Sequence, residues 1–269
     1  MLTHASEERP SDRPSDRPIL AVRGLVKAFG GHRAVDGVSF ALPRGAIGGL
    51  IGPNGAGKTT LFHCISGALA PTSGSVHLDG LALGDGSPPR AHAAGLGRTF
   101  QIPRPFPALT VLENAMLGAR AQMGERFWSV WFRPGAVAAD ERRVRDAARH
   151  WLDFVGLAAL EHEPARVLSG GQRKLLELAR AMVGEPSLVL LDEPGAGVNP
   201  ALLDRIVDRI AVLNAEGTSF LVIEHNMDLV ATLCRPVMVM SEGRLLASGD
   251  ARDVLADPRV VEAYLGEAA

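Results

Sequence analysis

The chain has 269 residues, of which 46% are hydrophobic, and a formal net charge of −2. It is long enough for one large domain, or for a domain with a subdomain, around a sizeable hydrophobic core. The near-neutral charge gives no general attraction to nucleic acid, and no apolar stretch of the sequence reaches the length needed to span a bilayer.

The first 18 residues differ in composition from the rest. The tetrapeptide Arg-Pro-Ser-Asp begins at Arg9 and again at Arg13, and Arg17-Pro18 follows. Proline at every fourth position blocks helix and sheet, and the repeats offer nothing apolar to bury, so we expect residues 1–18 to form a disordered tail. The segment also lacks the apolar core of a signal peptide, so we expect no leader. Cys64 and Cys234 have no metal-ligand spacing, which favours reduced thiols in a cytoplasmic protein.

A strand, a glycine-rich loop and a helix are predicted next. Residues 19–25 and 32–42 alternate between apolar and polar side chains, which indicates an antiparallel edge sheet. The apolar run Ala46–Ile51 fits a buried strand, and Thr59–Ala68 fits a helix. Between them, Gly52–Thr60 reads GPNGAGKTT. This order turns backbone N–H groups and a helix dipole toward a phosphate.

The glycine-rich segment matches the phosphate-binding pattern G-x-x-x-x-G-K-[ST]. A plain surface turn is the alternative, but chance rarely produces the full pattern between a fitting strand and helix. We expect Lys58 to reach the β- and γ-phosphates of ATP, and the Thr59 hydroxyl to ligate Mg²⁺. The candidate ATP-binding residues here are Gly52, Pro53, Asn54, Gly55, Ala56, Gly57, Lys58, Thr59 and Thr60.

The middle of the chain, from about residue 98 to residue 180, has a mainly helical pattern, which predicts a helical subdomain inserted into the nucleotide-binding core. Asp140–Val155 places its apolar side chains on one face of a helix. Leu168–Gln172 reads Leu-Ser-Gly-Gly-Gln and should open a further helix, which would offer a second set of phosphate-facing amides. The residues of this second turn are Ser169, Gly170, Gly171 and Gln172.

Two acids follow a buried strand in the second half. The apolar run Ser187–Leu191 leads into Asp192 and Glu193, at the carboxyl end of the strand, where open α/β sheets bind their ligands. A strand that ends in solvated acids is the alternative. With the phosphate loop present, we expect Asp192 to hold Mg²⁺, directly or through water. We expect Glu193 to orient and deprotonate the attacking water.

Another apolar strand, Phe220–Ile223, leads into Glu224 and His225. A single histidine after a strand is usually a loop residue. Here the same edge of the sheet should carry Asp192 and Lys58, so we interpret His225 as a contact to the γ-phosphate.

These motifs resemble those of the ATPase subunit of ATP-binding cassette (ABC) transporters, and the resemblance runs from about residue 19 to the C-terminus. The phosphate loop corresponds to the family's Walker A motif, and Ser169–Gln172 to its signature motif. Asp192 and Glu193 correspond to Walker B and the catalytic glutamate. His225 corresponds to the switch histidine.

The resemblance implies two further site residues and a fold. Gln101 stands where the family has its Q-loop glutamine, which implies a catalytic role and Mg²⁺ ligation. Phe29 stands where the family has an aromatic residue that stacks on adenine. The implied fold is an α/β P-loop NTPase core with a mainly parallel sheet, an N-terminal antiparallel β subdomain and an inserted helical subdomain. Residues 19–269 would form the ATPase domain, with the Q-loop and the helical signature subdomain at about 98–180.

A narrower resemblance is to the larger of the two ATPase subunits of bacterial branched-chain amino-acid importers. It rests on the segments Gly97–Gln101, Pro194–Pro200, Ile223–Met227 and Val261–Glu267. Gly195 replaces a more usual alanine. This departure concerns the groups that cross the dimer interface at that loop, and not ATP binding.

The resemblance implies an ATP-hydrolysing subunit, using ATP and Mg²⁺, that energises a membrane importer for branched-chain or related amino acids. Signature and phosphate loop would lie too far apart in one subunit to share a nucleotide. Two subunits, identical or sister, would therefore pair head to tail, with Ser169 and Gly171 of one capping the γ-phosphate held by Lys58 of the other. The partners would be integral membrane permease subunits and, indirectly, a periplasmic solute-binding protein, with no nucleic acid. The chain would be peripheral, at the cytoplasmic face of the inner membrane.

Three other functions are compatible with the motifs: the ATPase of an amide or urea importer, a soluble ABC ATPase outside transport, and a module that binds ATP without hydrolysing it. A single cassette without a long heptad run argues against DNA-handling relatives. Glu193, Gln101 and His225 argue against a module without hydrolysis. The aromatic segment Phe127–Phe132 is interpreted as packing within the helical subdomain, or alternatively as a contact with a membrane subunit or the lipid surface.

Overall fold

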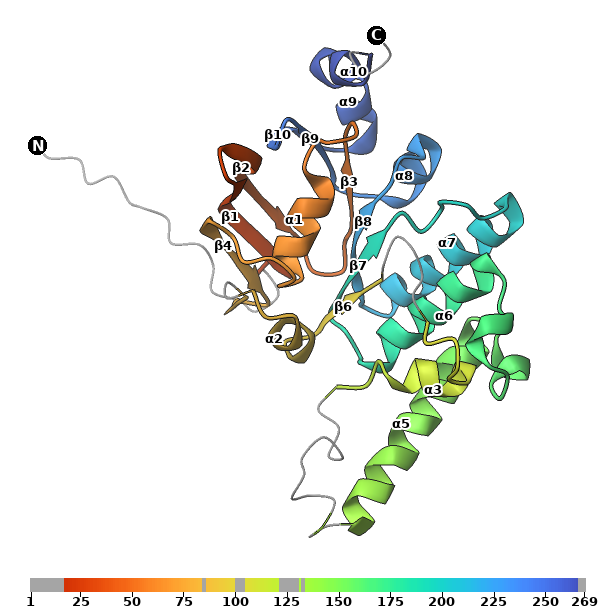
Figure 1. The fold of residues 1–269 in the computed structure, drawn as a ribbon. Helices are drawn as coiled ribbons and strands as arrows, with labels where there is room; N and C mark the ends of the chain where they lie inside the picture. Colours follow the sequence, from red (N-terminus) through yellow and green to blue (C-terminus); the bar gives the residue numbers. More distant parts are fainter. Residues whose placement is uncertain (1–16, 84–85, 100–104, 121–130, 132–133, 266–269) are drawn as a thin grey trace, which may run out of the picture.

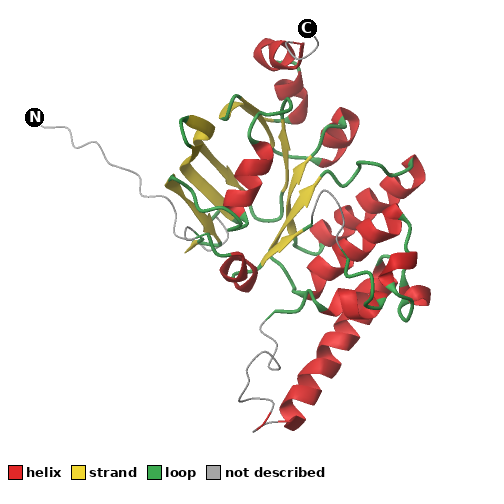
Figure 2. Cartoon of the chain, viewed as in Figure 1, coloured by secondary structure: helices red, strands yellow, loops and turns green. Residues whose placement is uncertain are grey.

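The computed structural model describes residues 17–83, 86–99, 105–120, 131 and 134–265. The strands gather in one half of the molecule and most of the helices in the other (Figures 1 and 2). Gln101 lies outside the described residues, as does most of the predicted tail. Of the aromatic segment 127–132, only Trp131 is described, and its side chain is 74% exposed.

The smaller of two sheets is antiparallel, with the strand order β2-β1-β4-β5. Its strands are β1 (Leu20–Phe29), β2 (His32–Leu42), β4 (Ser73–Leu78) and β5 (Leu81–Ala82). β1 and β2 contain the two alternating segments of the sequence, and they pair along their whole length, with register shifts within the pairing. The predicted N-terminal antiparallel sheet is therefore confirmed.

The larger sheet has the strand order β10-β9-β3-β8-β7-β6. Its strands are β3 (Ile47–Ile51), β6 (Leu96–Arg98), β7 (Leu188–Asp192), β8 (Ser219–Ile223), β9 (Val237–Ser241) and β10 (Arg244–Gly249). All neighbours are parallel except β9 and β10. Since β3, β8 and β7 are adjacent, the loops at their carboxyl ends meet at one edge of the sheet.

The central strands are buried on both faces, and their side chains alternate between two hydrophobic cores. In β7, Leu188 and Leu190 belong to the core shared with the smaller sheet, whereas Val189 and Leu191 belong to the core on the helical side. Helix α1 (Lys58–Ile65) packs into the first core and lies between the two sheets (Figure 1). The helix that follows the glycine-rich loop is therefore held from both sides.

The helical half contains the inserted segment that the sequence predicts. Along the 21-residue helix α5 (Pro134–Phe154), the predicted apolar face is buried at Val144, Ala148 and Leu152. This face packs against α3 (Val111–Met116) and α6 (Gly170–Val183). None of the helices in the described ranges is long and apolar enough to cross a membrane. The remaining described elements are α2 (Pro88–Ala93), α7 (Pro200–Ala215), α8 (Met227–Leu233), α9 (Ala251–Leu255) and α10 (Pro258–Leu265), with 3-10 turns η3 (Ala158–Leu160) and η4 (Ala165–Val167).

The fold is thus a mainly parallel α/β core with an antiparallel sheet on one side and helices on the other, as the sequence predicts. The division into a tail and a domain, with a subdomain at about 98–180, stays a prediction.

Candidate nucleotide-binding and catalytic site

The glycine-rich loop connects β3 to α1 and is fixed by two close backbone contacts. A Cβ atom on Gly52 would lie 2.0 Å from the carbonyl oxygen of Met240, and one on Gly57 would lie 2.1 Å from that of Ala34. Gly57 also has a φ of 95°, in the left-handed region that favours glycine. Both positions therefore require glycine, and the loop is held between β9 and β2.

Gly57 is the N-cap of α1, and no side chain of the described residues caps the helix there. The start of the helix thus presents backbone N–H groups and the positive end of its dipole to an anion. It faces an open cavity of about 270 Å³. The residues that line this cavity are Ala34, Asn54, Gly55, Ala56, Gly57, Lys58, Thr59, Thr60, Glu193 and His225.

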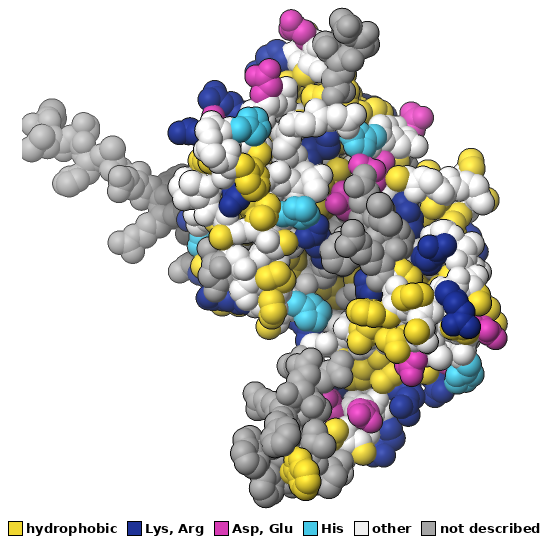
Figure 3. All heavy atoms as spheres, in the orientation of Figure 1, with side chains coloured by type: hydrophobic (Ala, Val, Ile, Leu, Met, Phe, Trp, Pro, Cys, Tyr) yellow, Lys and Arg dark blue, Asp and Glu magenta, His cyan; other side chains and the backbone are white. Residues whose placement is uncertain are grey.

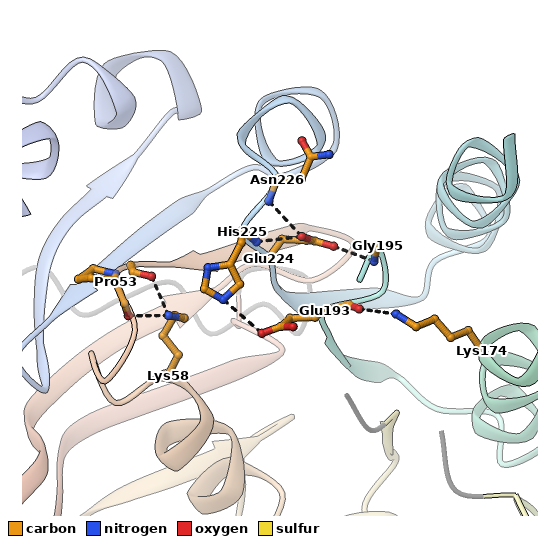
Figure 4. A network of polar contacts seen from close by, with 9 residues as sticks. Pro53, Lys58, Lys174, Glu193, Gly195, Glu224, His225 and Asn226 are labelled. Atoms are coloured by element: carbon orange, nitrogen blue, oxygen red, sulfur yellow. Dashed lines mark hydrogen bonds and ion pairs between the residues drawn. The ribbon is translucent and has the colours of Figure 1, made fainter. Parts of the chain in front are cut away.

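Lys58 is buried at the first position of α1. Its Nζ atom donates hydrogen bonds to the carbonyl oxygens of Gly52 (2.7 Å) and Pro53 (2.8 Å), as Figure 4 shows. A phosphate oxygen is a stronger acceptor for an ammonium group than a carbonyl oxygen, because it carries charge. A triphosphate in the cavity would therefore attract this side chain.

Glu193 and His225 meet across the ends of two neighbouring strands. β7 and β8 pair in parallel with Asp192 opposite Ile223, so the residues that follow them emerge side by side. The Nε2 atom of His225 lies 3.2 Å from Oε1 of Glu193 (Figure 4). Both side chains line the same cavity as Lys58. A carboxylate in this position is placed to accept a proton from a water molecule beside a bound phosphate.

Asp192, the last residue of β7, is a buried carboxylic acid in the field of a partly buried cation, Arg98. Burial raises the pKa of the Asp192 carboxyl, against the lowering effect of Arg98, and the neighbouring Glu193 raises it as well. Arg98, at the end of β6, donates a hydrogen bond to the Ser66 hydroxyl (2.7 Å). Burial lowers the pKa of its guanidinium, and Asp192 opposes that effect.

The donor groups at the cavity fit Mg²⁺. This ion is usually bound through one or two carboxylates together with phosphate oxygens, rather than in a cage made by protein alone. The described parts of the chain contain no cluster of three or more His, Cys, Asp or Glu side chains that would form such a cage. The Thr59 residue lines the cavity, and its hydroxyl is an oxygen donor of the kind that a phosphate-bound Mg²⁺ takes. Asp192 offers a second such donor directly before Glu193, although it is not among the described residues that line the cavity.

The Ser169 turn begins α6 with its own cap. The Ser169 Oγ atom accepts a hydrogen bond from the Gln172 N–H (3.2 Å), and Gln172 Oε1 accepts one from the Ser169 N–H (2.9 Å). This is a capping box. A Cβ atom on Gly171 would lie 1.9 Å from Cδ2 of Leu202 on α7, whereas one on Gly170 would meet nothing within 4 Å. Gly171 is therefore packed against the end of the Leu202 side chain, which would have to shift to admit a Cβ atom, whereas Gly170 is open.

Phe29 ends β1, and its ring is half exposed. The ammonium of Lys27 lies over it, 5.1 Å from the ring centroid. The exposed surface of the ring is compatible with the predicted stacking on adenine.

The predicted residues 54–60, Glu193 and His225 line one cavity, and the carbonyl groups of Gly52 and Pro53 accept the hydrogen bonds of Lys58. Residues 169–172 do not line this cavity within the described chain. Sequence reasoning missed two residues that bond the backbone beside Glu193, namely Lys174 and Glu224 (Figure 4). Glu224 carried a usable signal, because it directly follows a buried strand, as Glu193 nearly does. Lys174 carried none, since it is one more polar residue on an amphipathic helix.

Known proteins resemble this chain in sequence and in fold. The ABC transporter family model matches residues 35–196, and a model described as branched-chain amino acid ATP-binding cassette transporter matches residues 244–269. The high-affinity branched-chain amino acid transport ATP-binding protein BraF of Pseudomonas aeruginosa is 39% identical over 253 residues, covering 93% of this chain and 99% of BraF. The probable branched-chain amino acid transport ATP-binding protein LivG of Archaeoglobus fulgidus is 40% identical, covering 92% and 95%. The crystal structure of a nucleotide-free ATP-binding cassette from an ABC transporter superposes with a TM-score of 0.80 at 37% identity, covering 92% of this chain and 98% of that one.

Proposed function

This chain belongs to the ABC transporter family and is an ATPase of that family, and on that premise we propose that it is the ATP-hydrolysing subunit of an importer for branched-chain amino acids. The observation that carries the proposal is the single cavity that joins the phosphate loop to Glu193 and His225. The branched-chain amino acid transport named for BraF and LivG, and the C-terminal match at residues 244–269, support the solute class.

The proposed reaction uses the cavity as follows. The start of α1 and the Lys58 ammonium hold the β- and γ-phosphates of ATP, while Glu193 takes a proton from the attacking water. The water oxygen forms a bond to the γ-phosphorus, the bond from that phosphorus to the bridging oxygen breaks, and ADP and phosphate leave. His225 restrains the Glu193 carboxylate and contacts the γ-phosphate. Phe29 stacks on the adenine.

The proposed Mg²⁺ ligands are Thr59, Asp192 and Gln101. A bound Mg²⁺ supplies positive charge to the phosphate oxygens and so stabilises the charge that develops on them. The protein's own part is to hold those oxygens against the amides of α1.

The second phosphate-facing turn acts in a partner subunit. Ser169 and Gly171 of one subunit cap the γ-phosphate held by Lys58 of the other, in a head-to-tail pair of identical or sister subunits. Because the Ser169 Oγ accepts its bond from Gln172, its own proton is left to donate to a phosphate oxygen. ATP that touches both subunits favours the closed pair, since a ligand shifts an equilibrium only through differential affinity. Hydrolysis removes the γ-phosphate contacts that hold the two subunits together.

Integral membrane permease subunits carry the solute, supplied by a periplasmic solute-binding protein, so the chain lies at the cytoplasmic face of the inner membrane. A surface for the permeases is supported by exposed apolar side chains around α3. Phe106 precedes this helix and Leu117 follows it, at 58% and 48% exposure. Hydrophobic side chains gather over this part of the surface (Figure 3). Exposed apolar groups of this kind mark contact surfaces.

Uptake by proteoliposomes tests the proposal. The chain is assembled with its permease subunits and solute-binding protein, ATP is supplied on the ATPase side, and uptake of labelled leucine, urea and acetamide is compared. We expect ATP-dependent leucine uptake that isoleucine and valine inhibit. Uptake of urea or acetamide, with no uptake of leucine, would show that the solute is urea or an amide and not a branched-chain amino acid. ATP hydrolysis with no permease bound and no uptake would indicate a soluble ABC ATPase.

A further inference from the structure

The backbone of Glu193 is held in an uncommon conformation. Its φ is 49°, in the left-handed region that costs a residue with a Cβ atom about 1–2 kcal/mol. Such a conformation persists only when surrounding bonds enforce it. The N–H of Glu193 donates to the Ile223 carbonyl oxygen of β8 at 2.9 Å. The carbonyl oxygen of Glu193 accepts a turn bond from the Ala196 N–H at 3.1 Å. Further bonds to this segment come from two charged side chains outside β8.

Lys174, on α6, holds the carbonyl side of this segment. Its Nζ atom donates a hydrogen bond to the carbonyl oxygen of Glu193 (2.8 Å), as Figure 4 shows, and another to that of Pro194 (3.1 Å). Burial lowers the pKa of the Lys174 ammonium, and surrounding carboxylates, Glu224 foremost, oppose that effect. Hydrogen bonds from a charged donor are stronger than those between neutral groups, so this contact restrains the backbone more than a second amide would.

Glu224 holds the N–H side of the same segment. Its carboxylate is buried, and Oε1 accepts a hydrogen bond from the Gly195 N–H at 2.8 Å. Oε2 accepts bonds from the N–H groups of His225 (2.8 Å) and Asn226 (3.1 Å). A Cβ atom on Gly195 would lie 2.6 Å from Oε1, so the carboxylate would have to shift to admit a larger residue at this position. One carboxylate thereby connects the loop after β7 to the loop after β8.

We propose that Lys174 and Glu224 are positioning residues for ATP hydrolysis, which grip the Glu193–Gly195 segment through its carbonyl and N–H groups and so fix the Glu193 carboxylate against His225. This inference rests on the proposed role of Glu193. Each side chain has the charge that its backbone partners need, since an ammonium only donates and a carboxylate only accepts. Because α6 begins at the Ser169 turn, Lys174 also connects the turn that meets the partner's ATP to the base of its own subunit.

Replacing the ammonium without removing its aliphatic stem tests the role of Lys174. The variants are Lys174→Met, Lys174→Arg and, as a matched control, Arg120→Met, which removes another bond from a cation to a backbone carbonyl (Arg120 to Glu185, 2.6 Å) away from the cavity. Phosphate release gives kcat and KM for the full-length chain, and thermal melting gives stability. Hydrogen exchange, which needs no catalysis, reports on the backbone of residues 193–198.

We expect Lys174→Met to lower kcat about 10- to 100-fold with KM nearly unchanged, because a displacement near 1 Å at a reacting group costs on the order of 100-fold. Exchange at residues 193–198 should become about tenfold faster. Lys174→Arg should restore much of the rate, and Arg120→Met should resemble the wild type. A kcat within about threefold of the wild type in Lys174→Met overturns the inference. The inference is also overturned if the loss of rate in Lys174→Met accompanies a fall in melting temperature and Lys174→Arg does not restore the rate.

Glu224→Gln tests the other side of the segment. The amide has one acceptor oxygen in place of two, and its NH₂ group would face backbone N–H donors. We expect lower kcat and faster exchange at residues 193–198, and a double variant with Lys174→Met that is little slower than the slower single variant. Fully additive losses would show that the two side chains do not hold one segment. A wild-type chain without ATP turnover would instead refute the proposed function, while the exchange data would still report on the contacts.

Discussion

The two glycine-rich turns of this chain both begin a helix, but they satisfy the helix start in different ways. At α6, Ser169 and Gln172 cap each other, so the turn is complete by itself. At α1, the N-cap is Gly57, and the described residues place no side-chain cap on it. Its shape is enforced by the carbonyl oxygens of Ala34 and Met240, against which the loop glycines close.

This difference in capping indicates that the two turns have different roles, one in the affinity for ATP and the other in the closure of the dimer. A helix start with no side-chain cap has the most to gain from an anion, because the ligand supplies the acceptors that the sequence does not. A capped start gains less and offers chiefly one hydroxyl proton. We therefore expect the phosphate loop to supply most of the affinity for ATP and the Ser169 turn to act mainly when two subunits meet.

The largest effect should follow from Lys58→Ala in the phosphate loop. The variant loses the cation that faces the phosphates, and we expect measurable ATP binding to disappear, a loss of more than about 100-fold at 1.4 kcal/mol per factor of ten. Titration with a fluorescent ATP analogue measures it, with thermal melting to show that the variant is folded. Tight binding in this variant would refute the assignment of the loop.

Glu193→Gln should separate ATP binding from ATP hydrolysis, the two steps that take place in the cavity. The amide cannot accept a proton from water, so turnover should fall about 100-fold or more while ATP binding stays intact. A phosphate-release assay and the same titration measure the two quantities. Unchanged hydrolysis would place the base on another residue.

Ser169→Arg should affect closure and leave affinity in the single subunit unchanged. The long cationic side chain occupies the space where the turn would meet the partner's γ-phosphate, so we expect no ATP-dependent dimer. Size-exclusion chromatography with ATP, in a background that carries Glu193→Gln to prevent turnover, measures it. Normal dimerisation would contradict the model in which the two subunits share each nucleotide.

Ser169→Ala should have the smallest effect, and it measures the contribution of the Ser169 side chain as the N-cap of α6. Losing the side-chain acceptor of an N-cap costs about 1 kcal/mol of unfolding free energy. That is a fall of about 2–4 °C in melting temperature, with or without ATP. Thr110→Ala is a matched control, because Thr110 and Glu113 form the same capping box on α3. A similar loss of stability in both variants, with ATP-dependent dimerisation weakened only by Ser169→Ala, would separate the two roles of the serine.

The elements around the phosphate loop could be predicted from the sequence because local chemistry specifies them. Lys58 can face a phosphate only if a buried apolar strand is followed by a glycine-rich loop and then by a helix, and the sequence has these segments in that order. The same holds for Asp192 and Glu193 after β7, since the carboxyl end of a parallel strand is where such acids meet a ligand. Antiparallel pairing of β1 and β2 followed from their alternation and the short turn between them.

What the sequence did not reveal are contacts between segments that are distant in the chain. Gly171 reads as a phosphate-binding glycine, yet it also packs against the end of the Leu202 side chain, on another helix. The bonds of Lys174 and Glu224 to the Glu193–Gly195 segment depend on the order of β3, β8 and β7 and on the placement of α6. No local pattern encodes that order, because it results from the packing of the whole sheet. The place of β10 as an antiparallel edge strand is of the same kind.

The walls of the phosphate loop have a consequence for engineering. Ala34 belongs to the antiparallel sheet and Met240 to the parallel one, and each leaves no room for even a methyl group beside the loop. A graft of residues 47–65 alone onto a foreign scaffold would carry the motif but leave behind the surfaces that mould it. The smallest unit that could be transferred is thus defined by its three-dimensional contacts and not by one continuous segment, and it extends over about 210 positions of the chain, from β2 to β9.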